Sequence, residues 1–327
     1  MILPLALAVV SNAEVIKFEQ KGEPYFTYCH SHKPVLRIKP GDTIITKTVD
    51  ASNDAFVPGD SKVYPKLNFT KVNPQTGPFY IEGSEPGDTL VVRIEKITPN
   101  KTWGWSGVIP YFGALAPEYR TAMITEPLPD RLYIWQIDPQ KRILTVKAAM
   151  SKVGELSVPL RPFLGTIGVA PAGKECISAL APGSHGANMD FNEVVEGITL
   201  SFPVFEPGAL LMVGDGHAAQ GDGELAGAAI ETSMDVQFTV NLIKKKAIKW
   251  PRLENDRSIM SVGSTRPLMD AMRIACVDLI EWLVADYGFD KLDAYQLIGQ
   301  AAELEVANAV DPQFSVACKL DRRYLPR

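Results

Sequence analysis

The residues most capable of chemistry lie in one acidic, glycine-rich stretch of the chain. Between Arg161 and Lys244 there are ten acidic residues and one basic residue, Lys174, so this stretch has a formal charge of −9, against −5 for the whole chain. Carboxylates among small residues must be paired, protonated or bound to a cation if they are buried. Because no further lysine or arginine is close by in sequence, a metal ion is the expected counter-charge.

Two loops of this stretch carry the candidate ligands, and each contains one of the four histidines of the chain. His185 precedes Asp190 by five residues, and a second group contains Asp215, His217, Gln220, Asp222 and Glu224. Neutral imidazole and carboxylate form a standard ligand set for zinc and similar divalent ions. Other roles stay open here: a hydrogen-bonded structural role for a histidine, a turn cap for Asp222, and a backbone tie or substrate-amide contact for Gln220.

The composition sets outer limits on the class of protein. The chain has 327 residues, of which 46% are hydrophobic and 22% charged, which is typical of a soluble globular protein with a large core. A pI near 5.5 argues against nucleic acid as the main partner. The apolar run Ile2–Val10 is too short to span a bilayer, and no other segment approaches that length, so no membrane partner is expected.

The N-terminus and the cysteines bear on localisation without deciding it. Residues 1–13 fit either a truncated signal peptide, with small residues at Ser11 and Ala13, or a buried first strand, so a cytoplasmic and a periplasmic or secreted location both stay open. The four cysteines form no C-x-x-C pair, which argues against a zinc knuckle. One disulfide is expected only in an oxidising compartment.

The elements that must hold these loops are predicted to be mainly strands. Short β-branched or aromatic runs bounded by turn residues predict strands at Val35–Ile38, Thr43–Val49, Thr89–Ile97, Leu132–Ile137, Ile143–Lys147, Ile198–Phe205, Ala209–Val213 and Val236–Ile243.

Two helices are predicted after these strands. A stripe at spacings of three and four from Leu268 to Leu283 predicts one helix, with Thr265 as its cap and Gly288 as its end. Asp290 is expected to cap a second helix whose stripe runs to Val306. The chain is thus divided into the N-terminal segment 1–13, a β-rich part 14–150, a β-rich part 151–250 with the acidic loops, and a helical part 251–327. Strands followed by helices indicate a mainly β, α+β architecture.

The chain resembles the acetamidase/formamidase family. The resemblance is carried by Gly183-Ser184-His185-Gly186-Ala187-Asn188-Met189-Asp190, by Pro207-Gly208-Ala209-Leu210, by Gly214-Asp215-Gly216-His217-Ala218-Ala219-Gln220-Gly221-Asp222-Gly223-Glu224, and by Ala229-Ile230-Glu231. Weaker agreement extends over most of the chain, including Arg161 to Gly168, Ala294-Tyr295 and Val310-Asp311. Two departures are Ala187, where the family more often has glycine, and the surroundings of Asp50, which bear on the pocket entrance and its substrate.

The resemblance implies a jelly-roll-like β-sandwich or barrel enzyme that hydrolyses short amides to a carboxylate and ammonia. It implies a divalent metal, zinc first and calcium as a further candidate, and assembly as a homo-oligomer. On matching motif positions it implies metal ligands at Asp50, His185, Asp190, His217 and Glu231. Glu224 is the implied acid/base, and Asp215 or Asp222 would orient a ligand histidine, with Gln220 as a further candidate for substrate binding.

Other functions fit the sequence less well. A cysteine nucleophile would have to be Cys176, which stands beside Lys174 and Glu175 without the pattern of known cysteine amidases, and Gly263-Ser264 is too slight for a serine nucleophile segment. A non-catalytic β-sandwich that binds calcium or carbohydrate at the acidic loops is the main alternative. The two histidines argue against calcium, which prefers an all-oxygen shell.

Overall fold

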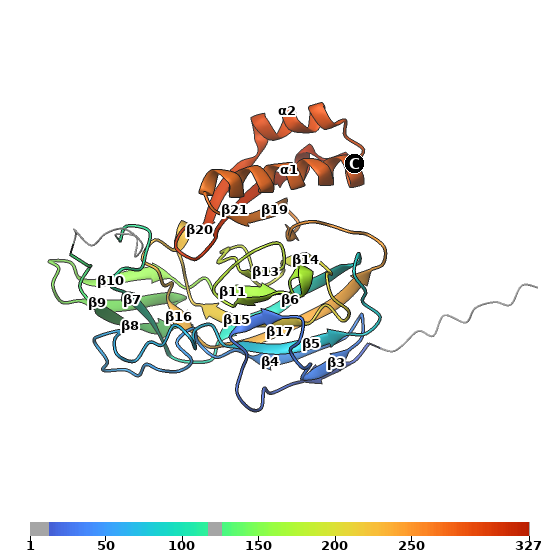
Figure 1. Ribbon diagram of the computed structural model, residues 1–327. Coiled ribbons are helices and arrows are strands. Elements are labelled where there is room, and N and C mark those ends of the chain that lie inside the picture. Colours follow the sequence, from blue (N-terminus) through green and yellow to red (C-terminus); the bar gives the residue numbers. More distant parts are fainter. Residues whose placement is uncertain (1–12, 117–125, 327) are drawn as a thin grey trace, which may run out of the picture.

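The computed structural model describes residues 13–116 and 126–326 and consists of two large β-sheets with two helices packed on one side (Figure 1). The described residues of the first sheet form nine strands in the order β1 (Val15–Lys17), β4 (Thr43–Lys47), β17 (Met234–Ile243), β6 (Thr89–Pro99), β14 (Thr199–Pro203), β18 (Arg252–Glu254), β19 (Ser258–Thr265), β21 (Phe314–Asp321) and β20 (Glu303–Asn308). Nearly all of the predicted N-terminal segment, residues 1–12, lies outside the described residues.

The second sheet carries the acidic loops. Its main path is β10 (Gly154–Pro159), β9 (Ile143–Ala148), β8 (Arg131–Asp138), β7 (Trp103–Val108), β16 (Glu231–Thr232), β15 (Leu211–His217), β11 (Phe163–Gly168) and β13 (Gly186–Asn188). Strand β5 (Gln75–Ile81) also pairs with β15, and β3 (Leu36–Ile38) pairs with β5. A small separate sheet joins β2 (Thr27–Cys29) to β12 (Cys176–Ser178), and the 3₁₀ helices are η1 (Ala172–Lys174), η2 (Asp222–Glu224) and η3 (Arg322–Tyr324).

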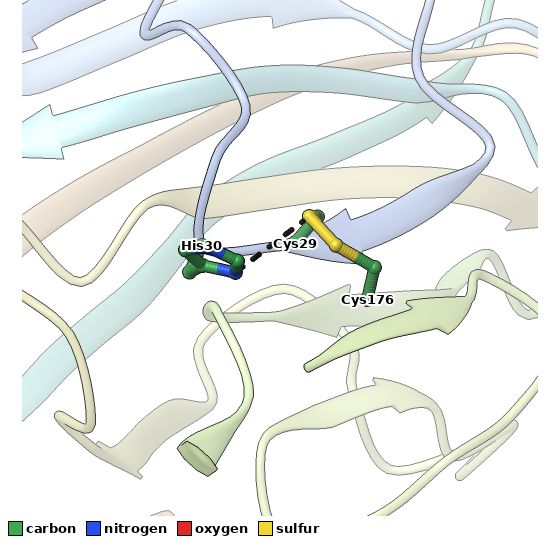
Figure 2. A group of neighbouring side chains, drawn as sticks. All are labelled: Cys29, His30 and Cys176. Carbon is green, nitrogen blue, oxygen red and sulfur yellow. Dashed lines mark hydrogen bonds between the residues drawn. A yellow bond between two sulfur atoms is a disulfide. The ribbon is translucent and has the colours of Figure 1, made fainter. Parts of the chain in front are cut away.

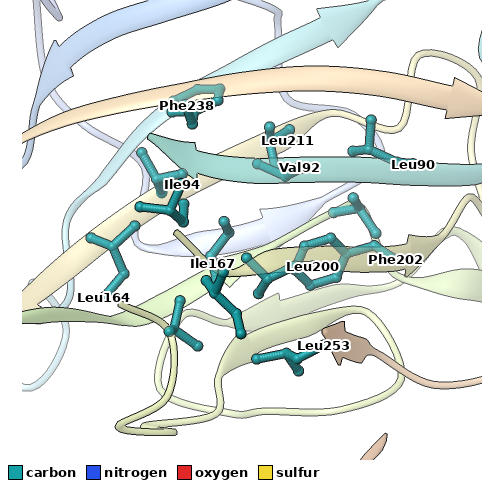
Figure 3. Close-up of a cluster of buried hydrophobic side chains, with 14 of the residues drawn as sticks. Leu90, Val92, Ile94, Leu164, Ile167, Leu200, Phe202, Leu211, Phe238 and Leu253 are labelled. Atoms are coloured by element: carbon teal, nitrogen blue, oxygen red, sulfur yellow. The ribbon is translucent and has the colours of Figure 1, made fainter. Parts of the chain in front are cut away.

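The main hydrophobic core lies between the two large sheets. In β17, Val236, Phe238 and Val240 are buried at every second position, as expected for a strand with one face toward a core. They meet residues of β11 and β15 from the other sheet, such as Leu164 and Leu211 (Figure 3). Full burial of each such side chain contributes about 1.5–3 kcal/mol. The expected mainly β, sandwich-like architecture is therefore confirmed.

Each of the eight predicted strands overlaps an observed one, and β15 differs most from its prediction. The predicted strand ends at Val213, whereas β15 continues to His217. The extra residues are Gly-Asp-Gly-His, and the sheet needs the glycines because neighbours approach closely: a Cβ on Gly216 would lie 2.3 Å from Cγ of Met234, and one on Gly214 would lie 2.6 Å from Nε2 of Gln75. The glycines that make this segment look like a loop are needed for close packing. The strand therefore continues, and His217 lies at its buried end.

The helices α1 (Leu268–Tyr287) and α2 (Lys291–Ala301) form a second core with β19 and β21. Gly288 ends α1 in a left-handed conformation, and the Asp290 side chain accepts from two backbone N–H groups of α2, both as predicted. Thr265 is not the cap of α1, because the N-cap position belongs to Pro267. Val306 lies in β20 instead of α2, and the part 251–327 also contains strands β18 to β21. Within the described residues, neither helix combines the length and apolar character needed to cross a bilayer.

Candidate active site

The second sheet gathers four buried acidic side chains around His217. His217 ends β15 and stands directly opposite Glu231 of β16 in antiparallel register. Asp215 lies two residues before His217 on the same strand, Asp190 follows β13, and Glu224 ends η2. All five side chains are at least nine-tenths buried. Residues separated by up to 41 positions in sequence are thus brought together by the paired strands β13, β11, β15 and β16 and by the η2 turn.

The distances around the His217 ring nitrogen Nε2 define this group, which we call the His217 cluster: His217, Asp190, Asp215, Glu224 and Glu231. Nε2 lies 3.2 Å from Oε2 of Glu231 and 3.3 Å from Oδ1 of Asp215. It lies 3.9 Å from Oδ1 of Asp190 and 4.0 Å from Oε1 of Glu224. Ligand atoms of this cluster fall into two groups of three, each group spanning no more than 4.8 Å.

Gln220 determines which nitrogen of His217 faces the acids. The Gln220 amide Nε2 donates to the backbone carbonyls of Asp190 and Ala307, at 2.8 and 3.1 Å, so its Oε1 is the atom 2.9 Å from His217 Nδ1. Nδ1 must therefore be the donor, since an amide oxygen only accepts. Nε2 then faces four carboxylates, where either a proton or a metal ion on this nitrogen supplies positive charge.

Four buried atoms of the His217 cluster have no hydrogen-bond partner among the described residues. They are Nε2 of His217, Oδ1 of Asp190, Oδ1 of Asp215 and Oε2 of Glu231. An unpartnered buried charge is costly, and between described residues no ion pair joins these carboxylates to a lysine or arginine. One imidazole nitrogen and three carboxylate oxygens are donors that a zinc-like divalent ion accepts. The residues present therefore fit a metal ion.

The pKa shifts in the cluster show that positive charge is favoured there: the pKa values of three of its carboxyl groups and of His217 are raised. Burial raises the pKa of Glu231 to about 7 despite the opposing effect of His217. Burial also raises the pKa values of Asp190 and Glu224 well above the usual carboxylate range, with nearby carboxylates adding to the rise. Burial would lower the pKa of His217, but the carboxylates of Glu231 and Asp215 outweigh it and raise that pKa well above its ordinary value. A divalent cation would favour the ionised carboxylates and remove this mutual repulsion.

Three of the clustered acids also have an unusual backbone. Asp190, Asp215 and Glu224 have φ values of 47°, 55° and 51°, in the left-handed region that residues other than glycine rarely adopt. Such conformations cost on the order of 1–3 kcal/mol each and concentrate at functional sites. The fold therefore holds these three carboxylates in place at a cost in backbone energy.

A layer of amide and hydroxyl groups supports the cluster from behind. Asn73 Nδ2 and Thr166 Oγ1 both donate to Oδ2 of Asp215, at 3.1 and 3.0 Å. Asn188 and Asn308 donate to Oδ2 of Asp190, at 2.7 and 2.6 Å, and both also donate to Asp311. These supporting roles were not predicted from the sequence. Asn188 and Asp311 lie within motifs that matched the family, whereas Asn73, Thr166 and Asn308 carry no comparable signal.

Two of the predicted ligands lie outside the His217 cluster. Asp50 has its own partners: Lys101 Nζ at 2.7 Å, Trp105 Nε1 at 3.2 Å and the backbone N–H of Ser52 at 3.0 Å. Although burial raises the pKa of Asp50, hydrogen bonds from Asp54, Lys101 and Ser52 and the charge of Lys101 give a net lowering. Asp50 is thus a neutralised carboxylate beside the site and not one of the atoms that meet at His217.

His185 also lies apart from the cluster. Its ring packs edge-on against Tyr28, with 5.5 Å between centroids, and it lines a separate hollow with Ser264, Thr265 and Gln313. Burial lowers the pKa of His185 to about 4, so its imidazole is neutral at pH 7. Asp222, another predicted residue, is exposed and accepts from Asn192. The orienting contact expected from Asp215 or Asp222 is made by Gln220.

A small cavity of about 40 Å³ adjoins the cluster. Its polar lining includes Asp215, Glu224 and Glu231. Its apolar lining comes from Ala51, Leu67, Phe69, Val72, Trp105, Ile109, Phe112, Leu180 and Ala228. A cavity with this mixed lining can accept a small molecule that has both a polar and an apolar part.

Gly165 provides a direct test of how tightly the cluster is built. A Cβ at this position would lie 2.6 Å from Oδ1 of Asp190 and 2.7 Å from both Oδ2 of Asp215 and Cε1 of His217. We expect Gly165→Ala to weaken binding of added zinc at the cluster at least about tenfold, because a small displacement of the clustered side chains from their positions is costly. Calorimetric titration of the purified variant with zinc measures this effect.

Gly221→Ala is the matched control, because a Cβ there meets no atom within 4 Å. Its φ of −83° also suits alanine. We expect its zinc affinity to stay close to that of the wild type. Equal behaviour of the two variants would show that the cluster does not depend on the close contact at Gly165.

Comparison with known proteins gives a consistent match over the chain. A model of the Acetamidase/Formamidase family matches residues 17–176 and 172–320. The chain is 24% identical to a formamidase of Methylophilus methylotrophus, over 90% of this chain and 87% of that protein. It is 28% identical to an acetamidase of Mycolicibacterium smegmatis, over 72% and 74% of the two chains. The crystal structure of an acetamidase from Yersinia enterocolitica superimposes with a TM-score of 0.90 at 37% identity, covering 98% and 96% of the chains.

Proposed function

The chain belongs to the acetamidase/formamidase family and is an amide hydrolase, and we propose that it cleaves a short-chain amide of the formamide or acetamide type with the help of a divalent metal ion. The observation that carries this proposal is the meeting of four unpartnered buried atoms at His217, next to a small cavity with an apolar wall. The products would be a carboxylate and ammonia.

The residues that would hold the metal are His217, Asp190, Asp215 and Glu231. We propose zinc because the set includes an imidazole nitrogen, whereas calcium prefers oxygen ligands alone. When bound, such an ion polarises a carbonyl and makes water more acidic. Gln220 would keep His217 Nε2 directed at the ion, as outer hydrogen bonds to ligand histidines generally do.

Glu224 is the proposed acid/base. Its Oε1 lies 4.0 Å from His217 Nε2 and accepts the backbone N–H of Ala229 at 3.0 Å, so its position is fixed beside the ligands. Glu224 would take one proton from the attacking water as the C–O bond forms. It would then give that proton to the amide nitrogen as the C–N bond breaks, because the nitrogen must leave protonated.

The apolar wall of the cavity is proposed to accept the acyl group. Trp105, Leu180 and Phe112 belong to the apolar lining, and Glu224 and Glu231 belong to the polar lining. A cavity of about 40 Å³ suits a hydrogen or a methyl group on the carbonyl carbon better than a ring. Assembly as a homo-oligomer remains part of the proposal, and light scattering of the purified protein tests it.

An amide series tests the proposed function. We expect ammonia release from formamide and acetamide, with kcat/KM falling at least about tenfold on going to benzamide, since a methylene misfit alone costs 10–200-fold. Leu180→Ala removes part of the wall and should reduce this preference. The absence of ammonia from every amide in the series, in protein with its metal bound, would contradict the proposal.

A further inference from the structure

Cys29, His30 and Cys176 form a second group of potential ligands outside the His217 cluster. Cys29 ends β2 and Cys176 begins β12, and the two are direct partners in the antiparallel pair of strands. Their sulfur atoms form a disulfide, and the imidazole of His30 lies beside it (Figure 2). From the sequence, a disulfide is expected only in an oxidising compartment, and His30, which belongs to no motif, is expected to be structural.

The position of His30 is not explained by the disulfide. Its Nδ1 lies 3.9 Å from Sγ of Cys29, and it makes no closer polar contact with a described residue. The two sulfurs and this nitrogen lie within 4.8 Å of one another. Zinc ligated at 2.3 Å to sulfur and about 2.0–2.1 Å to nitrogen in a tetrahedron places S and N about 3.6 Å apart and the two sulfurs about 3.8 Å apart. The S···N separation is already close to this value.

One of the two cysteines is exposed, so a metal ion can reach such a site from solvent. Cys29 is buried, with 2% of its surface exposed, whereas Cys176 is exposed. Rotation of the Cys176 side chain can therefore separate the sulfurs once their bond is cleaved. The Ser31 hydroxyl, with its oxygen 3.1 Å from Cys29 Sγ, can donate to a thiolate there. The exposed side of Cys176 leaves room for water as a fourth ligand.

We propose that, in the reduced protein, Cys29, His30 and Cys176 bind a thiophilic divalent cation such as zinc. A phosphine reductant and water convert the disulfide to two thiols and a phosphine oxide. Binding of the divalent ion then displaces one proton from each thiol, so two thiolates balance its charge. The disulfide and the metal-bound form exclude each other, because both use the same sulfur atoms. This inference is independent of the proposed amide hydrolysis.

Cobalt(II) provides a probe that distinguishes this site from the His217 cluster. Thiolate ligands give a sulfur-to-cobalt charge-transfer absorption, whereas the oxygen and nitrogen ligands at His217 do not. We expect this absorption to appear with one equivalent bound at the thiolate site of phosphine-reduced, desalted protein, and to be absent from the disulfide form. Cys176→Ser should abolish it, and His30→Ala should weaken cobalt binding at this site at least about tenfold.

Cys276→Ser is the matched control. Cys276 and Cys318 are free thiols whose sulfurs lie 3.5 Å apart, so they are the other cysteine pair that could bind cobalt. The absorption should persist in Cys276→Ser. Loss of the charge-transfer absorption in Cys276→Ser together with its retention in Cys176→Ser would overturn the proposal. Absence of the absorption from the reduced wild type would also overturn it. Circular dichroism follows the fold, and unfolding on reduction would equally overturn it, because the three ligands would then no longer be held together.

Discussion

Replacing Glu224 by glutamine is expected to lower kcat for amide hydrolysis by about 10²–10⁴-fold, the usual contribution of a general acid–base group. Glutamine keeps the shape of the side chain and an oxygen that can accept from Ala229, but it cannot take up the proton of water. Glu224, unlike the other three acids, has no buried oxygen without a hydrogen-bond partner among the described residues, so metal content should be retained. Steady-state ammonia release and elemental analysis on the same preparation measure both quantities.

The matched control for this variant is Asp222→Asn. Asp222 lies two residues away in the same 3₁₀ turn but is exposed and contacts Asn192. We expect its activity to stay near that of the wild type. Wild-type turnover by Glu224→Gln with full metal content would remove Glu224 from the mechanism and would transfer the acid/base role to another group.

Replacing His217 by asparagine is expected to abolish metal binding and to bring activity close to the uncatalysed level. The variant loses the imidazole nitrogen at the centre of the four acids and leaves their mutual repulsion uncompensated. The loss of metal affinity and of activity in His217→Asn should exceed 10–100-fold, the loss typical of mutations in residues that only orient a metal ligand. Gln220→Leu removes the hydrogen bond to His217 Nδ1 and should fall in that smaller range.

His185→Asn separates the two histidines that the sequence offered as ligands. Since His185 lines a different hollow, metal content per folded protein should be unchanged in this variant. Elemental analysis of the three variants, with circular dichroism to measure the folded fraction, gives the comparison. Metal retained in His217→Asn but lost in His185→Asn would place the centre at the other histidine.

Local patterns in the sequence predicted much of the fold. Alternating apolar residues were sufficient to predict strands such as Val236–Ile243. The cap of α2 at Asp290 and the end of α1 at Gly288 were predictable because these residue types favour those positions. The strand β20 was missed because Val306 continues a helical spacing. Its pairing with Val316 in β21 overrides that local pattern, which sequence periodicity cannot detect.

The candidate site was predictable where its residues lie close together in sequence. Asp215, His217 and Glu224 fall within ten residues, and the charge imbalance of their segment points to a cation. The support from Asn73 and Asn308 depends on contacts across more than a hundred residues, so no spacing reveals it. Asp50 illustrates the converse, because its charge is met by Lys101, a partner remote in sequence.

A metal-restoration experiment tests directly whether a metal ion at the His217 cluster is needed for amide hydrolysis. Protein freed of metal by chelation and desalting should release no ammonia from formamide or acetamide. Activity should return in proportion to the zinc bound, as measured by elemental analysis, in the wild type and not in His217→Asn. Full amide hydrolysis by wild-type protein in which elemental analysis finds no divalent metal would show that the enzyme does not depend on a metal.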